Sequence, residues 1–300
     1  MRIAVTGATG LVGTQCVELF RQAGHEVFRL VRSSANLGEY DVLWNPAKGV
    51  LDRASLAGLD AVIHLAGENI ARGRWSASKK KRILASRLDG TRLLSQALAA
   101  LDDGPKILIS ASAIGYYGDT GATAVDEFGP NAHDFLARVC RLWEAETEVA
   151  RRAGVRVVNA RIGVVLSCRG GALAQMLPPF RLGVGGVLGA GTQYLSWITL
   201  RDVARALLFA VEEPRLEGGV NFVANGSITN RDFTKILGRV LGRPTVFPVP
   251  GLVARIALGE MADALLLVST RVSPRKLESC GFAFCDPTLE EALRAELGSK

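Results

Sequence analysis

The sequence has few of the residues that build metal sites and disulfide frameworks. It contains only three histidines, and its five cysteines include no CxxC pair. The cysteines are Cys16, Cys140, Cys168, Cys280 and Cys285. We therefore expect no Cys/His zinc site and no bound metal. Because scattered cysteines in odd number fit a reducing compartment, we expect a cytoplasmic protein.

Long apolar runs are also absent. None approaches the ~18 residues that a membrane-spanning helix needs, and the opening MRIAVTGATG reaches glycine too soon for a secretory signal. The net charge of +7 is moderate, and basic residues are not interleaved with aromatic ones. We therefore expect no membrane span and no nucleic acid as a partner. An anionic small ligand is the simpler explanation of the charge.

Strand patterns alternate with helical patterns through the first two thirds of the chain. The expected strands are residues 2–6, 26–31, 60–66, 106–110 and 155–166, and the expected helices are 11–23, 77–101, 134–152 and 201–212. Buried strands separated by helices are the pattern of βαβ units. We therefore predict an α/β fold with a Rossmann-like doubly wound parallel sheet.

The composition of the sequence changes near residue 167. Residues 167–190 are rich in glycine and proline and predict a largely irregular excursion around one helix, bordering a cleft. Helical patterns follow at 229–242 and 252–267, with Thr229 and Asp232 spaced like a capping box. We expect a Rossmann-like domain over residues 1–227 and a small, mostly helical domain over residues 228–300.

A glycine-rich turn, TGATGLVG at residues 6–13, joins the first expected strand to the first expected helix. Its three regularly spaced glycines permit a tight turn and a close approach of the backbone to a pyrophosphate. The N-terminus of the helix adds unpaired N–H groups and the positive end of its dipole. This context predicts a dinucleotide site. The expected contacts are Gly7, Thr9, Gly10, Leu11 and Val12.

The end of the second expected strand indicates which dinucleotide binds. An acidic residue there would bind the ribose 2′-hydroxyl of NAD, but the chain has Val31, Arg32 and Ser33. A guanidinium can pair with the 2′-phosphate of NADP, and one charge-assisted hydrogen bond contributes roughly 1.5–3 kcal/mol. We therefore predict that Val31 and Arg32 contact the cofactor and that it is NADP(H). The alternative is that Arg32 is a solvated loop residue.

Four segments, TGATGLVG, DAVIHLAG, SASAIGYYG and LSWITLRDVARAL, stand in the order found in extended short-chain dehydrogenases/reductases. Three longer segments resemble the atypical branch of that group called epimerase family proteins. They are AGENIARGRWSASKKKRILASRLDGT, GGALAQMLPPFRLGVGGVLGAGTQYLSWI and GEMADALLLVSTRVSPRKL. The resemblance covers essentially the whole chain. It implies a Rossmann-like domain, a small C-terminal domain and bound NADP, and it implies no established reaction.

The resemblance also implies which further residues lie beside the cofactor. Leu65, Ala66 and Gly67 would border it, and Ile162, Gly163 and Val164 would line its nicotinamide side. Arg87 takes the place of an asparagine in the family's N-x-x-G-T frame, here RLDGT. We expect Arg87 to contact the cofactor or another ligand, with a structural ion pair as the alternative.

The catalytic groups implied by the resemblance are largely missing. The superfamily uses a Tyr as general acid or base, with a Lys four residues later that lowers its pKa. Phe135 and Val139 take those places, and no tyrosine of the chain is followed by such a lysine. The remaining candidates are Ser112, in the position of the serine that binds the substrate oxygen, and Tyr116, which could supply a hydroxyl.

Structural interpretations compete with these functional ones. Ser112 could bind backbone at a strand end, Glu68 fits a cap or an ion pair better than acid–base work, and His64 fits a buried histidine. One hypothesis is an NADP-dependent oxidoreductase or sugar-nucleotide epimerase with a rebuilt active site. The other is a non-catalytic, NADP(H)-dependent regulatory or cell-division-related protein. Either would bind an unidentified small molecule between the domains, and the oligomeric state stays open, a homodimer included.

Overall fold

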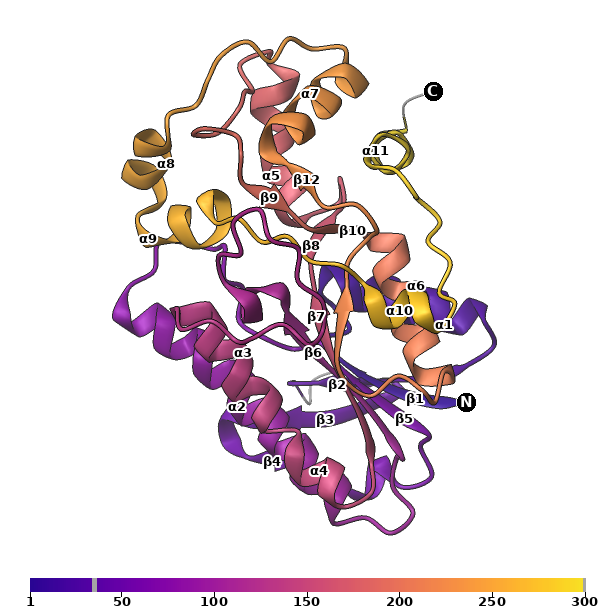
Figure 1. The fold of residues 1–300 in the computed structure, drawn as a ribbon. Helices are drawn as coiled ribbons and strands as arrows, with labels where there is room; N and C mark the ends of the chain where they lie inside the picture. Colours follow the sequence, from indigo (N-terminus) through magenta and orange to yellow (C-terminus); the bar gives the residue numbers. More distant parts are fainter. Residues whose placement is uncertain (34–36, 299–300) are drawn as a thin grey trace.

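The computed structural model describes residues 1–33 and 37–298 and contains one large sheet (Figure 1). Its strands are β1 (Arg2–Thr6), β2 (Glu26–Val31), β3 (Asp41–Asn45), β4 (Val50–Leu51), β5 (Ala61–His64), β6 (Ile107–Ala113), β7 (Arg156–Ile162) and β11 (Gly218–Phe222). They lie in the order β11–β7–β6–β5–β1–β2–β3–β4, and every neighbouring pair is parallel except β3 with β4. The predicted parallel α/β sheet is confirmed.

Helices cover both faces of this sheet. One face carries α1 (Leu11–Gln22) and α6 (Leu200–Glu212), and the other carries α2 (Ala77–Ala99), α3 (Phe135–Ala145) and α4 (Glu148–Arg152) (Figure 1). Successive side chains of β1 point to opposite faces of the sheet, so they belong to two different apolar cores. Ile3 and Val5 join the apolar cluster under α1 and α6, whereas Ala4 joins the cluster under α2 and α4. The sheet is therefore doubly wound, as predicted.

The direction in which successive strands are added to the sheet reverses at β1. β2 pairs with one edge of β1, and β5 pairs with the other. The connections that leave β1 and β5 therefore run to opposite faces and open a crevice at the carboxyl ends of the strands. The glycine turn after β1 and the segment after β5 both stand at this crevice.

The C-terminal part packs at the carboxyl end of the sheet (Figure 1). Its elements are β8 (Val164–Leu166), α5 (Gly171–Arg181), β9 (Tyr194–Leu195), β10 (Trp197–Thr199), β12 (Ile228–Thr229), α7 (Asn230–Leu241), α8 (Gly251–Leu258), α9 (Glu260–Ala262), α10 (Arg275–Ser279) and α11 (Leu289–Leu297). Leu173, Phe233 and Leu293 place α5, α7 and α11 in one apolar cluster. The Thr229 side chain accepts the N–H of Asp232 at 3.2 Å, so the predicted helix cap is confirmed.

The expected single strand at residues 155–166 is wrong. β7 stays in the main sheet, whereas β8 pairs with β10 in a separate two-stranded sheet. Gly163 lies at the break. A Cβ there would lie 2.7 Å from the Val223 side chain and 2.8 Å from the carbonyl oxygen of Ser196. Close packing against neighbouring segments therefore ends β7, a cause that an apolar pattern cannot indicate.

Two expected helices are also interrupted. The helix expected at 134–152 is split into α3 and α4, and the helix expected at 252–267 breaks at Gly259, whose φ is 63°. Six strands, β3, β4, β9, β10, β11 and β12, were not expected from the sequence. Four of them have only two or three residues, and β11 begins with a pair of glycines, which have low strand propensity. None of the helices in the described ranges is both long and apolar enough to cross a lipid bilayer.

Candidate functional site

The glycine turn after β1 packs tightly against the segment that follows β5. Gly7 has a φ of 66°, and a Cβ there would lie 2.9 Å from the carbonyl carbon of Leu65. A Cβ on Gly13 would lie 2.1 Å from the carbonyl oxygen of Gly7. Side chains at these positions would therefore collide with backbone, so the turn requires glycine for its conformation and for its contacts.

The N-terminus of α1 is open to a ligand. Its N-cap is the exposed Gly10, and no side chain caps the helix. The first-turn N–H groups, which include those of Leu11 and Val12, have no acceptor within a helix. Together with the helix dipole they favour an anion such as a pyrophosphate.

Arg169 joins this helix terminus from a distant part of the chain. A pocket of about 310 Å³ is lined by Thr9, Gly10, Leu11, Thr14, Arg169 and Gly170. Arg169 is exposed and hydrogen-bonds to Gln15 on α1. Its guanidinium adds positive charge beside the free N–H groups. The sequence offered no signal for this residue, because it follows β8 without any motif.

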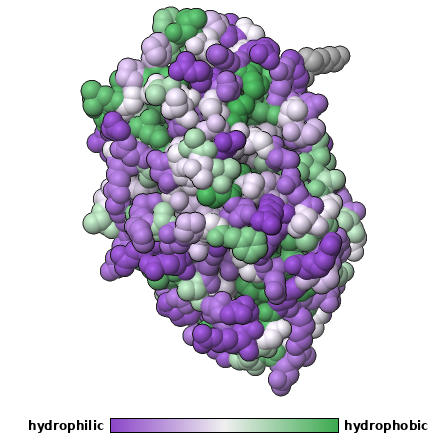
Figure 2. Space-filling model, in the orientation of Figure 1, coloured by the Kyte–Doolittle hydropathy of each residue, from purple (hydrophilic) through white to green (hydrophobic). Residues whose placement is uncertain are grey.

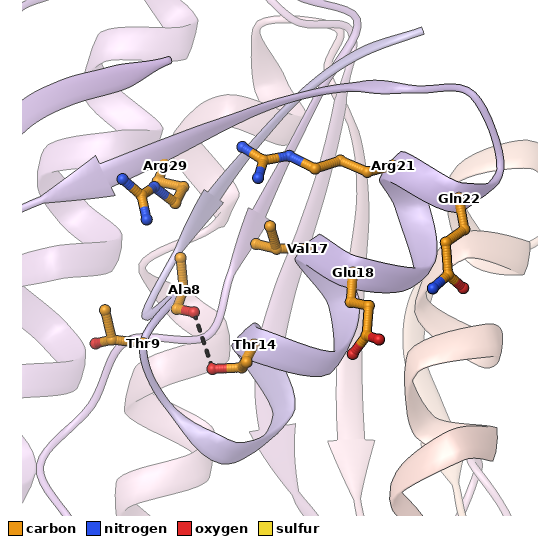
Figure 3. A pocket seen from close by; sticks show the side chains of 8 residues that line it. All are labelled: Ala8, Thr9, Thr14, Val17, Glu18, Arg21, Gln22 and Arg29. Atoms are coloured by element: carbon orange, nitrogen blue, oxygen red, sulfur yellow. Dashed lines mark hydrogen bonds between the residues drawn. The ribbon is translucent and has the colours of Figure 1, made fainter. Parts of the chain in front are cut away.

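A second pocket continues along the outer side of α1 (Figure 3). Its volume is about 620 Å³, and it is lined by Ala8, Thr9, Thr14, Val17, Glu18, Arg21, Gln22 and Arg29. Thr9 and Thr14 belong to both pockets. The Arg29 guanidinium binds Asp41 at 2.7 and 2.8 Å, so its charge is largely compensated. The side chain of Arg21 reaches over the same pocket in Figure 3.

The predicted ribose-binding residues lie at the end of β2. Val31 is partly buried, and Arg32 is exposed and forms no ion pair within the described residues. β2 ends beside β1, because Leu30 pairs with Thr6 in the parallel register. Both side chains therefore lie at the same edge of the sheet as the glycine turn.

A single hydroxyl organises the segment after β5. Thr6 Oγ1 accepts the N–H groups of Leu65 and Ala66 at 3.0 and 3.1 Å. It also lies 2.7 Å from His64 Nδ1. Because two N–H groups occupy its lone pairs, the hydroxyl donates its proton to Nδ1, and His64 must carry its hydrogen on Nε2. That Nε2 atom is buried without a hydrogen-bond partner in the described part of the chain.

Arg87 lies directly beneath this segment. Its Nη1 donates to the carbonyl oxygens of Glu68 and Ile83 at 3.2 and 3.1 Å. Its guanidinium lies 5.0 Å from the Trp143 ring centroid, and a Cβ on Gly67 would lie 3.5 Å from it. Burial lowers the pKa of Arg87. The structure thus brings Arg87 together with Gly67. Among the described residues Arg87 forms no side-chain ion pair, whereas Glu68 pairs with Lys79 at 2.7 Å.

Gly163 and Val164 lie at the junction of β7 and β8. The Gly163 N–H bonds to the carbonyl oxygen of Phe222 at 3.0 Å, and the Val164 N–H bonds to that of Ser196 at 2.9 Å. These contacts hold the junction at the carboxyl end of the sheet. Both residues are partly buried, so the structure leaves part of each accessible.

Ser112 belongs to a buried polar network at the ends of β6 and β7. Its hydroxyl donates to Glu144 Oε1 at 2.7 Å. The Arg161 guanidinium binds both carboxylate oxygens of Glu144 at 2.9 Å. Burial opposes the charge on Arg161, but the hydrogen bonds to Glu144 outweigh it and raise the Arg161 pKa. The Glu144 carboxylate thus accepts hydrogen bonds from both the Ser112 hydroxyl and the Arg161 guanidinium.

The two adjacent tyrosines differ in environment. The Tyr117 hydroxyl donates to Asn221 at 2.7 Å and accepts from Arg161 at 2.8 Å, and burial raises its pKa to about 12. Tyr116 is partly buried, and the Arg161 guanidinium lies 3.5 Å from its ring centroid. The Tyr116 hydroxyl forms no hydrogen bond within the described residues. It is therefore the tyrosine hydroxyl here that a ligand could still engage.

Phe135 and Val139 are occupied by packing. The Phe135 ring makes an edge contact with Trp75, with centroids 5.5 Å apart, and Lys80 Nζ lies 4.9 Å from the same ring. Val139 is only 2% exposed. Neither side chain has a titratable proton. Both make packing contacts instead. No cluster of side chains suited to a metal ion occurs in residues 1–33 or 37–298.

We predict that His64 makes the protein less stable in acid. Burial lowers the pKa of His64 from its usual 6.5 to about 3. Since the folded state resists protonation, stability is complete above pH 6.5 and falls between that pH and the folded value. The slope should be about 1.4 kcal/mol per pH unit. Urea unfolding at several pH values should show a flatter profile for His64→Gln, whereas a flat wild-type profile over that range would contradict the assignment. His133→Gln, at an exposed position, is the control.

A second prediction concerns the Glu144–Arg161 pair. Glu144→Ala leaves a buried guanidinium without its carboxylate and should cost about 3 kcal/mol of unfolding free energy. The double variant Glu144→Ala, Arg161→Met removes both charges and should be more stable than Glu144→Ala alone. Chemical denaturation measures both. Equal or lower stability of the double variant would show that the pair is not an electrostatic unit.

Known proteins share this architecture along the whole chain. A family model described as NAD dependent epimerase/dehydratase family matches residues 3–224, and another described as Domain of unknown function (DUF1731) matches residues 249–296. "Epimerase family protein MT2273" of Mycobacterium tuberculosis is 44% identical over 291 residues, which cover 97% of this chain and 96% of that protein.

Solved structures show the same similarity. The human epimerase family protein SDR39U1 (isoform2), crystallised with NADPH, superposes with a TM-score of 0.90 at 34% identity and covers 99% of both chains. A Corynebacterium glutamicum structure described as a nucleoside-diphosphate sugar epimerase has a TM-score of 0.82 at 34% identity, covering 99% of this chain and 58% of that one. The chain therefore belongs to the NAD-dependent epimerase/dehydratase family, with the epimerase family proteins among its relatives.

Proposed function

We propose that this protein binds NADP(H) at the carboxyl end of its parallel sheet. The observation that carries the proposal is the uncapped N-terminus of α1 behind a turn that only glycine can form. Gly7, Thr9, Gly10, Leu11 and Val12 would hold the pyrophosphate, with Arg169 as an added cation. Leu65, Ala66 and Gly67 would border the cofactor on the β5 side, and Gly163 and Val164 would border the nicotinamide.

The preference for NADP(H) over NAD(H) is assigned to Arg32. Its side chain is exposed at the end of β2, and no carboxylate stands at that strand end to bind a 2′-hydroxyl. The human relative, at 34% identity over 99% of both chains, holds NADPH in its crystal structure. Arg87 would add a second cation, beneath Gly67, at the ribose or another ligand group.

A second, small-molecule ligand would bind next to the cofactor, between the Rossmann-like domain (residues 1–227) and the small domain (residues 228–300). An oxidoreductase or sugar-nucleotide epimerase would need a proton donor or acceptor at the ligand oxygen. Tyr116 supports this role because its hydroxyl is uncommitted, and Ser112 lies in the network next to it. Ser112 directs its proton to Glu144, so it would accept rather than donate a hydrogen bond.

A second function, a non-catalytic NADP(H)-dependent regulator, is supported by a different observation. The two positions that would hold the Tyr–Lys pair carry packed apolar side chains, and Arg161 is compensated by Glu144. Such a protein would report cofactor binding or redox state to a partner without turnover. The cofactor site would be the same in both functions, so the two hypotheses differ only in whether binding leads to turnover.

We predict that NADPH binds at least about tenfold more tightly than NADH, the effect of one charge-assisted contact. Titration calorimetry and melting temperature should both show it. Arg32→Ala should remove most of the preference, whereas Arg152→Ala, which changes an exposed arginine at the end of α4, should not. Equal affinity for both cofactors would refute the Arg32 assignment, and an Arg87→Ala variant with unchanged affinity would remove Arg87 from the site.

We also predict that any hydride transfer depends on Tyr116 and Ser112. The protein would be loaded with NADPH or NADP and followed by nicotinamide absorbance against sugar nucleotides and small carbonyls. Tyr116→Phe should lower kcat by about a hundredfold, the usual contribution of a general acid or base. Ser112→Ala should lower it too, whereas Tyr40→Phe, on the exposed surface, should not. Tight NADPH binding without turnover of any compound would favour the regulatory function.

A further inference from the structure

An apolar surface lies at the end of the molecule remote from the amino ends of the strands. It consists of Leu182, Val184, Val246, Phe247, Leu252, Val253 and Ile256, and we call it the α8 surface. The most exposed members are Leu182 at 78%, Val246 at 73% and Ile256 at 66%. Figure 2 shows apolar atoms at the top and upper left, where Figure 1 places α8 and the loop that leads to it. Apolar side chains gathered in this way mark an interaction surface.

The three segments that form the α8 surface lie side by side. Gly183 faces Pro244, where a Cβ would lie 3.7 Å away, and the Val249 N–H bonds to the carbonyl oxygen of Val187 at 2.8 Å. α8 follows directly on this loop. Leu252, Val253 and Ile256 share one side of α8, whereas Ala254 is only 7% exposed and packs inward. The helix therefore turns its larger apolar side chains away from the protein.

The uncompensated charge around the α8 surface is positive. Residues 149–201 and 233–259 contain no aspartate or glutamate. Arg181 is next to Leu182, Arg243 is next to Pro244, and both are exposed without an ion pair in the described part of the chain. Arg255, on α8, is paired with Asp263 at 2.9 Å. Two uncompensated guanidinium groups therefore flank the exposed apolar side chains.

The exposed apolar side chains and the uncompensated arginines together indicate what binds to the α8 surface. A second copy docked through the same surface would bring together two identical surfaces whose uncompensated charges are all positive, which like-charge repulsion opposes. A lipid surface with anionic headgroups satisfies both features, because apolar side chains enter the boundary with the acyl chains while cations meet the phosphates. We propose that the α8 surface docks this protein on anionic membranes, as a peripheral contact and not as a span.

The contacts that fix α8 to the rest of the protein are consistent with membrane docking. Arg74, in the loop before α2, donates to the carbonyl oxygens of Ile256 and Ala257, and Lys80 pairs with Glu260 just after α8. α8 is thus fixed to the segment between β5 and α2, which borders the candidate cofactor site. A protein docked in this way would hold that site close to the membrane surface.

Vesicle co-sedimentation tests the proposal. The full-length protein should pellet with vesicles of phosphatidylcholine and phosphatidylglycerol and only weakly with phosphatidylcholine alone. The double variant Leu252→Glu, Ile256→Glu should bind at least about tenfold more weakly, because two inserted side chains become charged. The matched control is Val50→Glu, Val149→Glu, which changes two exposed apolar residues elsewhere. Each variant is first shown to keep the wild-type melting temperature and NADPH affinity.

The arginines are tested separately. Arg181→Gln and Arg243→Gln should each weaken binding to phosphatidylglycerol vesicles by about fivefold and leave the weak binding to phosphatidylcholine unchanged. Failure of the wild type to bind, or an equal loss in the Val50→Glu, Val149→Glu control, would overturn the proposal. So would sedimentation of the free protein as a dimer that Leu252→Glu, Ile256→Glu dissociates, since a second copy would then cover the surface.

Discussion

The hydroxyl of Thr6 joins the two loops on which the candidate site depends. One oxygen accepts the N–H groups of Leu65 and Ala66 and donates to His64, so the ends of β1 and β5 are locked in a single arrangement. The glycine turn can then lie against the β5 segment with no room for a Cβ on Gly7. The crevice of the doubly wound sheet becomes a shaped site because these contacts leave the loops no alternative spacing.

A second set of contacts, made of charged groups and aromatic rings, lies at the ends of β6 and β7. Arg161 binds Glu144 through two hydrogen bonds and also contacts Tyr117, while Ser112 donates to the same carboxylate. A buried ion pair of this kind stabilises little by itself but is costly to break. The pair therefore fixes β6, β7 and α3 relative to one another. It also engages the hydroxyls of Ser112 and Tyr117, which leaves them less available to a ligand.

The sequence predicted the fold well where one physical signal dominated. Apolar runs marked β1, β2, β5 and β6, and the glycine turn located the candidate dinucleotide site, because both signals are local. It failed where a distant segment decided the outcome. Gly163 ends β7 because Val223 and Ser196 leave no space, and Arg169 reaches the α1 terminus from beyond β8. The Glu144 partner of Ser112 was missed for the same reason, since the two residues are 32 positions apart along the chain.

The sequence by itself determined the doubly wound sheet, the glycine turn and the absence of any Tyr followed four residues later by Lys, because each depends on residue type at short spacing. Tertiary structure alone decided that Ser112 donates a hydrogen bond to Glu144, that Arg87 lies beside Gly67 and that Leu182, Phe247 and Ile256 share one exposed surface. These are contacts between segments far apart along the chain. Only the packed fold sets their distances, and hydrogen bonds and apolar contacts act over a few ångströms.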